Sequence, residues 1–156
     1  MKYIIAIDPG ANGGLVLGND KGEVLNVSKM PATPLDLLTL LGSYKQQAEE
    51  NCACVVCYLE DVHSIPGDGA NRMFNFGKNF VEIRMALEAL GISTITMKPQ
   101  VWIKTYQLGS SSQCKSKTEW KNKLKAKAQQ IFPLQNVTLW SSDALLIYKY
   151  AQMIEK

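Results

Sequence analysis

The run CVVCYLE at residues 54–60 most constrains the fold of this chain, because it is apolar on both of its faces. A β-strand of this kind has to be covered on both sides, so we predict that it is a central strand of a sheet. The run YIIAID at residues 3–8 is a second predicted strand. Predicted strands and helices alternate along the chain, which indicates an α/β domain with the 54–60 strand beside the first one.

The other predicted elements give this sheet its helical cover. GLVLG and EVLNVSK are joined by the turn NDKG, so the first three strands are expected to form an antiparallel meander. A length of 156 residues is typical of one domain, and we assign residues 1–156 to it. Periodicity predicts a last strand at 92–97 and helices over about 35–50, 75–90, 119–131 and 142–154.

Composition argues against a membrane protein and against a disulfide framework. No stretch approaches the roughly 20 apolar residues of a membrane span, and the apolar run after MKYIIAID is too short for a signal peptide. We therefore expect a cytoplasmic protein without a membrane partner. The four cysteines are expected to be free thiols, with a zinc site as the less favoured alternative: Cys52, Cys54, Cys57 and Cys114.

Two carboxylates stand at the ends of the apolar strands. Asp8 ends the first strand, directly before Pro9 and Gly10, and Glu60 ends the 54–60 strand. If these strands are parallel neighbours, both side chains lie at the edge where α/β sheets bind ligands, about 5 Å apart. Two adjacent carboxylates repel each other unless one is protonated or a cation lies between them, and oxygen ligands suit Mg²⁺. A turn-forming role is the simpler alternative for an aspartate before Pro-Gly.

Asp143 is a third candidate for the same place. It opens the predicted helix SSDALLIYKYAQMI, where capping and the helix dipole give a structural explanation for an acid. However, Asp143 shares a helical stripe with Ile147, Tyr150 and Ile154, whereas Lys149 and Gln152 lie opposite. An acid on the inward stripe is unfavourable unless it is paired or metal-bound. The sequence therefore predicts that Asp143 reaches the edge that holds Asp8 and Glu60.

Three segments together resemble the RuvC-type Holliday-junction resolvases of the ribonuclease H superfamily, most of all the phage-encoded forms. They are IIAIDPGANGGLVL, CYLEDVHSIPGDGANRMFNFGK and SSDALLIYKYA, and the likeness spans most of the chain. The resemblance implies a ribonuclease H-like five-stranded mixed sheet flanked by helices. It also implies a homodimer that cuts four-way DNA junctions, in the host cytoplasm if the protein is phage-encoded. Asp8, Glu60 and Asp143 match the acidic positions that hold two Mg²⁺ or Mn²⁺ ions and catalyse paired hydrolytic nicks.

The sequence departs from this family pattern at two positions. Cellular members carry a further aspartate three residues before the last acid, where this chain has Trp140. Water, Asp61 or a shifted geometry are the alternatives for that ligand, although Asp61 is expected to point to the opposite face from Glu60. Cellular members also place an aromatic residue shortly after the strand glutamate, and His63 stands near that place here. His63 is a candidate for stacking on a base, with a plain loop histidine as the alternative.

Positive charge is concentrated in one part of the chain. Residues 98–127 hold eight of the 17 basic residues and one of the 14 acidic ones, a net charge of +7 in a chain whose total is +3. Lysines that follow one another at four-residue intervals disfavour a helix unless a partner such as phosphate neutralises them. A solvated lysine face is the alternative. The candidate DNA-binding residues are Lys98, Lys104, Lys117, Lys121 and Lys125, with Arg72, Lys78 and His63 from the segment after Glu60.

Three other functions remain compatible with the same residues. One is a branched-DNA-binding module of this fold that lacks catalysis, which the tryptophan at position 140 makes credible. Another is a different ribonuclease H-like nuclease, because the same acidic cluster serves several substrates. The third is an ATPase of the actin and sugar-kinase type, since IDPGANGG resembles its phosphate loop. Those enzymes enclose the nucleotide between two such domains, so the length of this chain argues against the ATPase.

Overall fold

The computed structural model describes residues 1–61 and 69–155 and builds them around one five-stranded sheet. A short 3₁₀ turn at Ser111–Gln113 lies between the third and fourth helices. The strands are β1 (Lys2–Asp8), β2 (Gly14–Asn19), β3 (Val24–Lys29), β4 (Cys54–Glu60) and β5 (Ser93–Met97). The helices are α1 (Pro34–Glu50), α2 (Ala70–Ala89), α3 (Pro99–Thr105), α4 (Lys117–Ile131) and α5 (Ser142–Ile154).

The sheet has the order β3-β2-β1-β4-β5. The first three strands form the predicted antiparallel meander. β4 lies parallel to β1 and to β5, with Ile7 opposite Leu59 and Glu60 opposite Met97. The predicted five-stranded mixed sheet, with the 54–60 strand beside the first one, is therefore confirmed.

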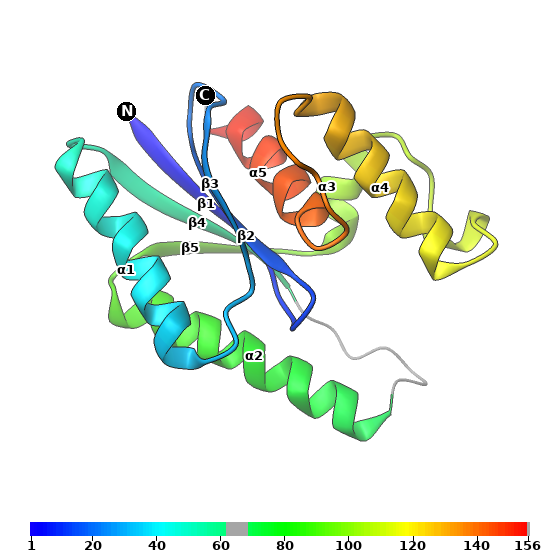
Figure 1. The fold of residues 1–156 in the computed structure, drawn as a ribbon, viewed down its shortest axis with the longest axis horizontal. Helices are drawn as coiled ribbons and strands as arrows, with labels where there is room; N and C mark the ends of the chain where they lie inside the picture. The colour runs from blue at the N-terminus through cyan, green and yellow to red at the C-terminus, as the bar shows by residue number, and fades with distance from the viewer. Residues whose placement is uncertain (62–68, 156) are drawn as a thin grey trace.

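Helices cover both faces of this sheet (Figure 1). Alternate β1 residues point to opposite faces, so Ile4 and Ala6 pack under α5 whereas Ile5 and Ile7 pack against the α1 and α2 layer. Both sets are fully buried. Continuous apolar strands are required for a sheet covered on both sides, which is why β1 and β4 lack the apolar–polar alternation of a half-exposed strand.

Two details of the helices differ from the sequence-based predictions. α2 begins at Ala70 rather than near residue 75, and no side chain caps its first turn, so the sequence offers no start signal there. Gln152 was expected on the polar side of α5 but is only 2% exposed, and its Nε2 donates to the carbonyl of Asp20 at 3.0 Å. The first two turns of α5 are buried on every side because the helix lies between the sheet and α4.

Two further sequence-based statements concern the thiols and the membrane. All four cysteines are free, as predicted, with Cys57 buried and Cys52 and Cys54 exposed. Within the described residues, no helix has both the length and the apolar character needed to cross a bilayer.

Candidate active site

Asp8 and Glu60 lie at the same end of the parallel pair β1 and β4, on the face that α5 covers. Each follows the last matched pair of the ladder, Ile7 and Leu59. Strand alternation places Asp8 on the side of Ala6, and Glu60 on the side of Tyr58, and both of these neighbours belong to the core under α5. The structure therefore brings the two carboxylates to one edge, as the sequence predicted.

Asp143 reaches this edge from the first turn of α5 and is held by Lys121. Asp143 is 5% exposed, and its Oδ2 accepts a hydrogen bond from Lys121 Nζ at 2.5 Å. Its Oδ1 accepts from the hydroxyl of Ser142 at 3.1 Å. The contact requires α4 to pack along α5, which it does through its buried apolar residues Leu124 and Ala128. Lys121 lies beside these residues and so turns toward the acids.

Glu60 is held by a tryptophan that the sequence analysis did not identify. Trp102 Nε1 in α3 donates to Glu60 Oε2 at 2.8 Å, and the indole itself is 1% exposed. A buried tryptophan ring needs an acceptor for its N–H group, which is the only signal that the sequence carries for this contact. The pairing depends on β5 running directly into α3, which returns over the end of β4.

The pKa values of the Asp8 and Glu60 carboxyls are both raised by burial and by neighbouring negative charge. Burial raises the pKa of the Asp8 carboxyl well above its ordinary value, and the charges of Asp143 and Glu60 raise it further. No hydrogen bond from the described residues offsets this burial. Burial and then repulsion by Asp143 raise the pKa of Glu60 to about 7, while the Trp102 hydrogen bond opposes that rise. Burial and mutual repulsion at this edge therefore favour the uptake of protons or of a cation.

Lys121 supplies the opposing charge. Burial lowers the pKa of its ammonium, but attraction first by Asp143 and then by Asp8 outweighs burial and leaves the pKa above its usual value. Its positive charge in turn lowers the pKa of Glu60 and of Asp8. Lys121, predicted to lie on a phosphate-binding face, is thus an ion-pair partner inside the acidic cluster.

The donor set has the chemistry of a divalent-cation site. Carboxylate oxygens are the ligands that Mg²⁺ prefers, and mutual repulsion favours a bound cation over three free charges. Among the residues that the structure describes, however, no three acidic, histidine or cysteine side chains converge closely enough to hold a metal ion.

The turn after Asp8 is fixed to α2. Gly10 has φ of 107°, a left-handed conformation that favours glycine, and its N–H donates to Asn79 Oδ1 at 2.7 Å. A side chain on Gly10 would also meet the ring of Phe76. Asn79 is a second site residue that the sequence analysis did not identify. Its place three residues after Phe76, on the inner face of a helix, is the pattern that indicates it.

Trp140, the departure noted in the sequence, packs onto the strand beside Asp8. Gly14 pairs directly with Asp8 across β1 and β2. A Cβ on Gly14 would lie 3.0 Å from Trp140 Cε3 and 2.9 Å from its carbonyl oxygen. Paired residues of neighbouring strands share a face, so the indole lies on the Asp8 side of the sheet. Trp140 thus adds apolar cover beside Asp8.

The other predicted DNA-binding residues are distributed over three elements. Lys98 precedes α3 and Lys104 lies in its last turn, both exposed. On α4, Lys117 is exposed and Lys125 half-buried.

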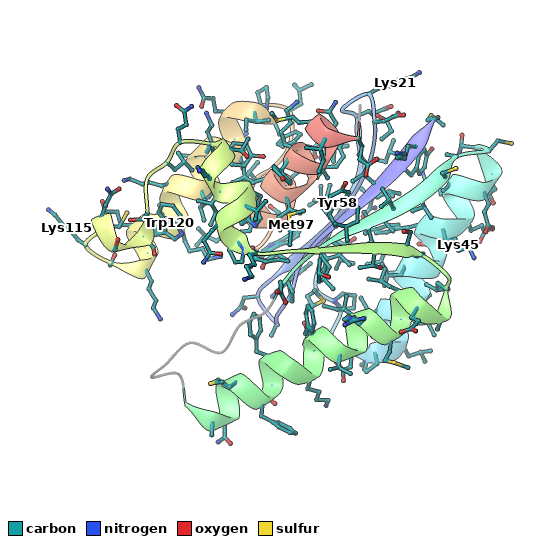
Figure 2. The ribbon with its side chains drawn as sticks, turned by 180° about the vertical axis from the view of Figure 1, so that it is seen from behind. Lys21, Lys45, Tyr58, Met97, Lys115 and Trp120 are labelled. Atoms are coloured by element: carbon teal, nitrogen blue, oxygen red, sulfur yellow. The ribbon has the colours of Figure 1, made fainter. Side chains whose placement is uncertain are left out.

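Lys78 lies on the outer face of α2, with its Nζ 3.7 Å from Glu82 Oε1. His63 lies outside the described residues, as does the side chain of Arg72, which belongs to the first turn of α2. Figure 2 shows the start of α4 projecting from the body, with Lys115 at its tip.

The fold of this chain is similar to that of known protein structures. RuvC of Thermus thermophilus in complex with a Holliday junction substrate superposes with a TM-score of 0.64 at 13% sequence identity, over 99% of this chain and 96% of that one. The fold is that of RuvC. A second Thermus thermophilus RuvC structure gives a TM-score of 0.60 at 15% identity, over 98% of this chain and 95% of that one. No protein-family model and no curated protein sequence matches the chain. The similarity in fold covers nearly the whole of the chain.

Proposed function

We propose that this protein is a metal-dependent endonuclease that nicks four-way and other branched DNA. The observation that carries the proposal is the gathering of Asp8, Glu60 and Asp143 at the carboxyl edge of β1 and β4. The solved structure of RuvC with a Holliday junction substrate supports the choice of DNA substrate, because it has the same fold over nearly the whole length. We also propose, from the resemblance of the sequence to phage-encoded forms, that the protein is phage-encoded.

The three acids Asp8, Glu60 and Asp143 would hold Mg²⁺ or Mn²⁺, with two ions in each site. When bound, such ions supply activation of water and stabilisation of the leaving 3′ oxygen during in-line phosphodiester hydrolysis. The chain's own residues prepare this site. Trp102 holds the Glu60 carboxylate by its N–H group, and Asn79 holds the turn that follows Asp8. Trp140 and α5 keep Asp8 away from bulk water.

Lys121 is proposed to serve both the acidic site and the DNA. It neutralises Asp143, and its half-exposed side chain would also reach a phosphate of bound DNA. Lys117, Lys125, Lys98 and Lys104 would extend that contact along the backbone, and Arg72, Lys78 and His63 are proposed to contribute from the α2 side.

The DNA contacts are tested by salt dependence. Each phosphate contact to duplex DNA contributes about −0.9 to the slope of log affinity against log salt. Lys117→Ala and Lys125→Ala should each reduce the steepness of that slope by about 1. Lys21→Ala is the matched control, because Lys21 lies on the turn far from α4 (Figure 2). Slopes that are unchanged in the α4 variants would contradict this interface.

Cleavage is tested with end-labelled four-way junction, three-way junction, linear duplex and RNA–DNA hybrid, each with Mg²⁺ or EDTA. Asp8→Asn is expected to abolish cleavage and to retain junction binding. Asp36→Asn, the same change in an exposed acid at the start of α1, serves as control and should cut like the wild type. Cleavage that survives Asp8→Asn would refute the assigned site, and hybrid cutting alone would indicate another ribonuclease H-like nuclease.

A branched-DNA-binding protein without catalysis is the second candidate. It is favoured by Trp140 in place of an acid and by the open arrangement of the three carboxylates. Tight binding of the junction with no nick in Mg²⁺ or Mn²⁺ would select it. Metal-dependent nicks in the branched substrates would eliminate it.

A further inference from the structure

Two buried aromatic side chains connect Glu60 to the helix that carries Asp143. The indole N–H group of Trp102 donates to Glu60, and Tyr106 lies four residues later, at the C-terminal end of α3. The two rings are in edge-to-face contact, with centroids 6.4 Å apart and an interplanar angle of 64°. The hydroxyl of Tyr106 donates to the main-chain carbonyl of Leu146, three residues after Asp143 in α5.

Both hydrogen bonds lie inside the core under α5. Trp102 is 1% exposed and Tyr106 8%, so each polar group depends on its protein partner for a hydrogen bond. The carbonyl of Leu146 has two lone pairs, so it can take part in the α5 ladder and still accept the tyrosine hydroxyl. This hydrogen bond is therefore additional to those that form the helix. What it fixes is the position of α5 relative to α3.

The start of α3 is fixed to the strand that ends in Glu60. Met97, the last residue of β5, pairs with Glu60, and its carbonyl accepts from the N–H group of Asp61 at 2.7 Å. α3 begins two residues later at Pro99, whose ring restricts the backbone in the first helical turn. Figure 1 shows α3 directly after the end of β5 and beside α5. The helix is thus held by β4 through the sheet at one end, and by α5 through Tyr106 at the other.

The distance between Glu60 and Asp143 depends on how β4 and α5 lie relative to each other. Apolar packing between these elements is non-directional, whereas a hydrogen bond is restricted in both length and angle. Mg²⁺ requires near-ideal octahedral geometry with oxygen atoms at about 2.0–2.1 Å, so displacement of one carboxylate relative to the other weakens its binding. Hydrogen-bond partners behind the ligands of a metal site orient those ligands for this reason.

We propose that α3 is a brace that sets the distance between Glu60 and Asp143, with Tyr106 as a positioning residue for the divalent cation. The proposal rests on the proposed function for the presence of the cation, and it deepens that function by naming what orients the ligands. The Tyr106 hydroxyl donates to a main-chain carbonyl rather than to a carboxylate. It therefore acts on Asp143 through α5, and on Glu60 through the ring of Trp102.

The test is the affinity for Mn²⁺, measured by isothermal titration calorimetry of the full chain without DNA. Tyr106→Phe removes only the hydroxyl and should lower this affinity by at least about tenfold. Tyr148→Phe is the matched control, because the buried Tyr148 hydroxyl donates to the carbonyl of Asn19 at 2.8 Å, at the end of the sheet opposite the acids. Urea unfolding should show a loss of stability in both variants, whereas only Tyr106→Phe should lose Mn²⁺ affinity.

Trp102→Phe keeps the proposal testable if Tyr106→Phe fails to fold. The substitution keeps an aromatic ring, removes the N–H group that holds Glu60 and should also lower Mn²⁺ affinity about tenfold. Trp120→Phe, the same change in a partly buried residue of α4, should leave the affinity unchanged. Because the two contacts are links of one brace, the double variant should bind Mn²⁺ about as weakly as the weaker single variant.

Wild-type Mn²⁺ affinity in both α3 variants would overturn the brace, and so would losses that add in full in the double variant. An equal loss in Tyr148→Phe would also overturn it, because the loss would then be a general effect of lower stability. A wild type that binds no Mn²⁺ would overturn the brace together with the metal dependence of the proposed function. Because the titration contains no DNA, a protein with the expected Mn²⁺ affinities that cuts no substrate would contradict the nuclease alone.

Discussion

Glu60→Gln is expected to stabilise the metal-free protein at alkaline pH. The folded protein raises the pKa of Glu60 to about 7 from an ordinary value of 4.5, so ionised Glu60 destabilises the folded state. A difference of that size corresponds to about 3 kcal/mol at pH 8, where the side chain is ionised in both states. Glutamine keeps an oxygen to accept the Trp102 N–H group and carries no charge to repel Asp143.

The sign of the pH dependence follows from the raised pKa. Between pH 7 and pH 4.5 the folded state binds more protons than the unfolded state at this group, so its contribution to stability increases as the pH falls. The advantage of Glu60→Gln should therefore decrease from about 3 kcal/mol at pH 8 to about 1 kcal/mol at pH 5.

Thermal unfolding in EDTA at both pH values measures this difference. For a chain of this size, about 3 kcal/mol corresponds to an increase in melting temperature of roughly 6 to 12 °C. Glu50→Gln, at an exposed position at the end of α1, is the matched control and should leave the melting temperature unchanged at both pH values. A variant no more stable than the wild type at pH 8, or equally stabilised at both pH values, would refute the electrostatic account of the site.

Four other outcomes follow from the same contacts. Lys121→Met leaves Asp143 without its cation and should destabilise the EDTA-treated protein by about 1–2 kcal/mol. The value is modest because the lysine side chain is 45% exposed. Saturating Mg²⁺ should restore part of this loss in a melting experiment. Trp102→Phe removes the hydrogen bond to Glu60, so urea unfolding should show a loss of about 1–3 kcal/mol and NMR titration a further rise in the pKa of Glu60. Gly14→Ala forces a methyl group against Trp140 and Ser28 and should destabilise by about 1–3 kcal/mol in the same urea assay. Mg²⁺ at 100 times its dissociation constant should stabilise the wild type by about 2.7 kcal/mol in thermal unfolding, and Asp8→Asn should lose most of that gain.

The sheet was predictable because its strands carry local signals. Apolar runs covered on both faces, and the NDKG turn, specify the central strands and the meander without knowledge of the rest of the chain. The position of Asp8 and Glu60 at one edge follows from that topology alone. The placement of Asp143 at this edge could be predicted from the helical period alone. The same period wrongly placed Gln152 on the solvent-facing side of α5. Burial of α5 depends on α4, which no local pattern in α5 describes.

The partners of the acids were not predictable in the same way. Lys121 has the same four-residue spacing as Lys117 and Lys125, and only the packing of α4 on α5 separates it from them. Trp102 lies 42 residues along the chain from its partner Glu60, and Asn79 lies 69 residues from its partner Gly10. Periodicity reports which face of an element is apolar, whereas such contacts depend on how two elements are placed relative to each other.

The contact between Trp140 and Gly14 makes Trp140 hard to replace by an aspartate through a single substitution. An aspartate in place of Trp140 would leave a void over Gly14. A larger residue at position 14 could not fill it, since a Cβ there already lies 3.0 Å or less from the carbonyls of Ser28 and Trp140. Accommodating an aspartate at position 140 would need the backbone on both sides to move together. Positions 14 and 140 are therefore coupled, and the residue at one of them limits which substitutions the other can accept.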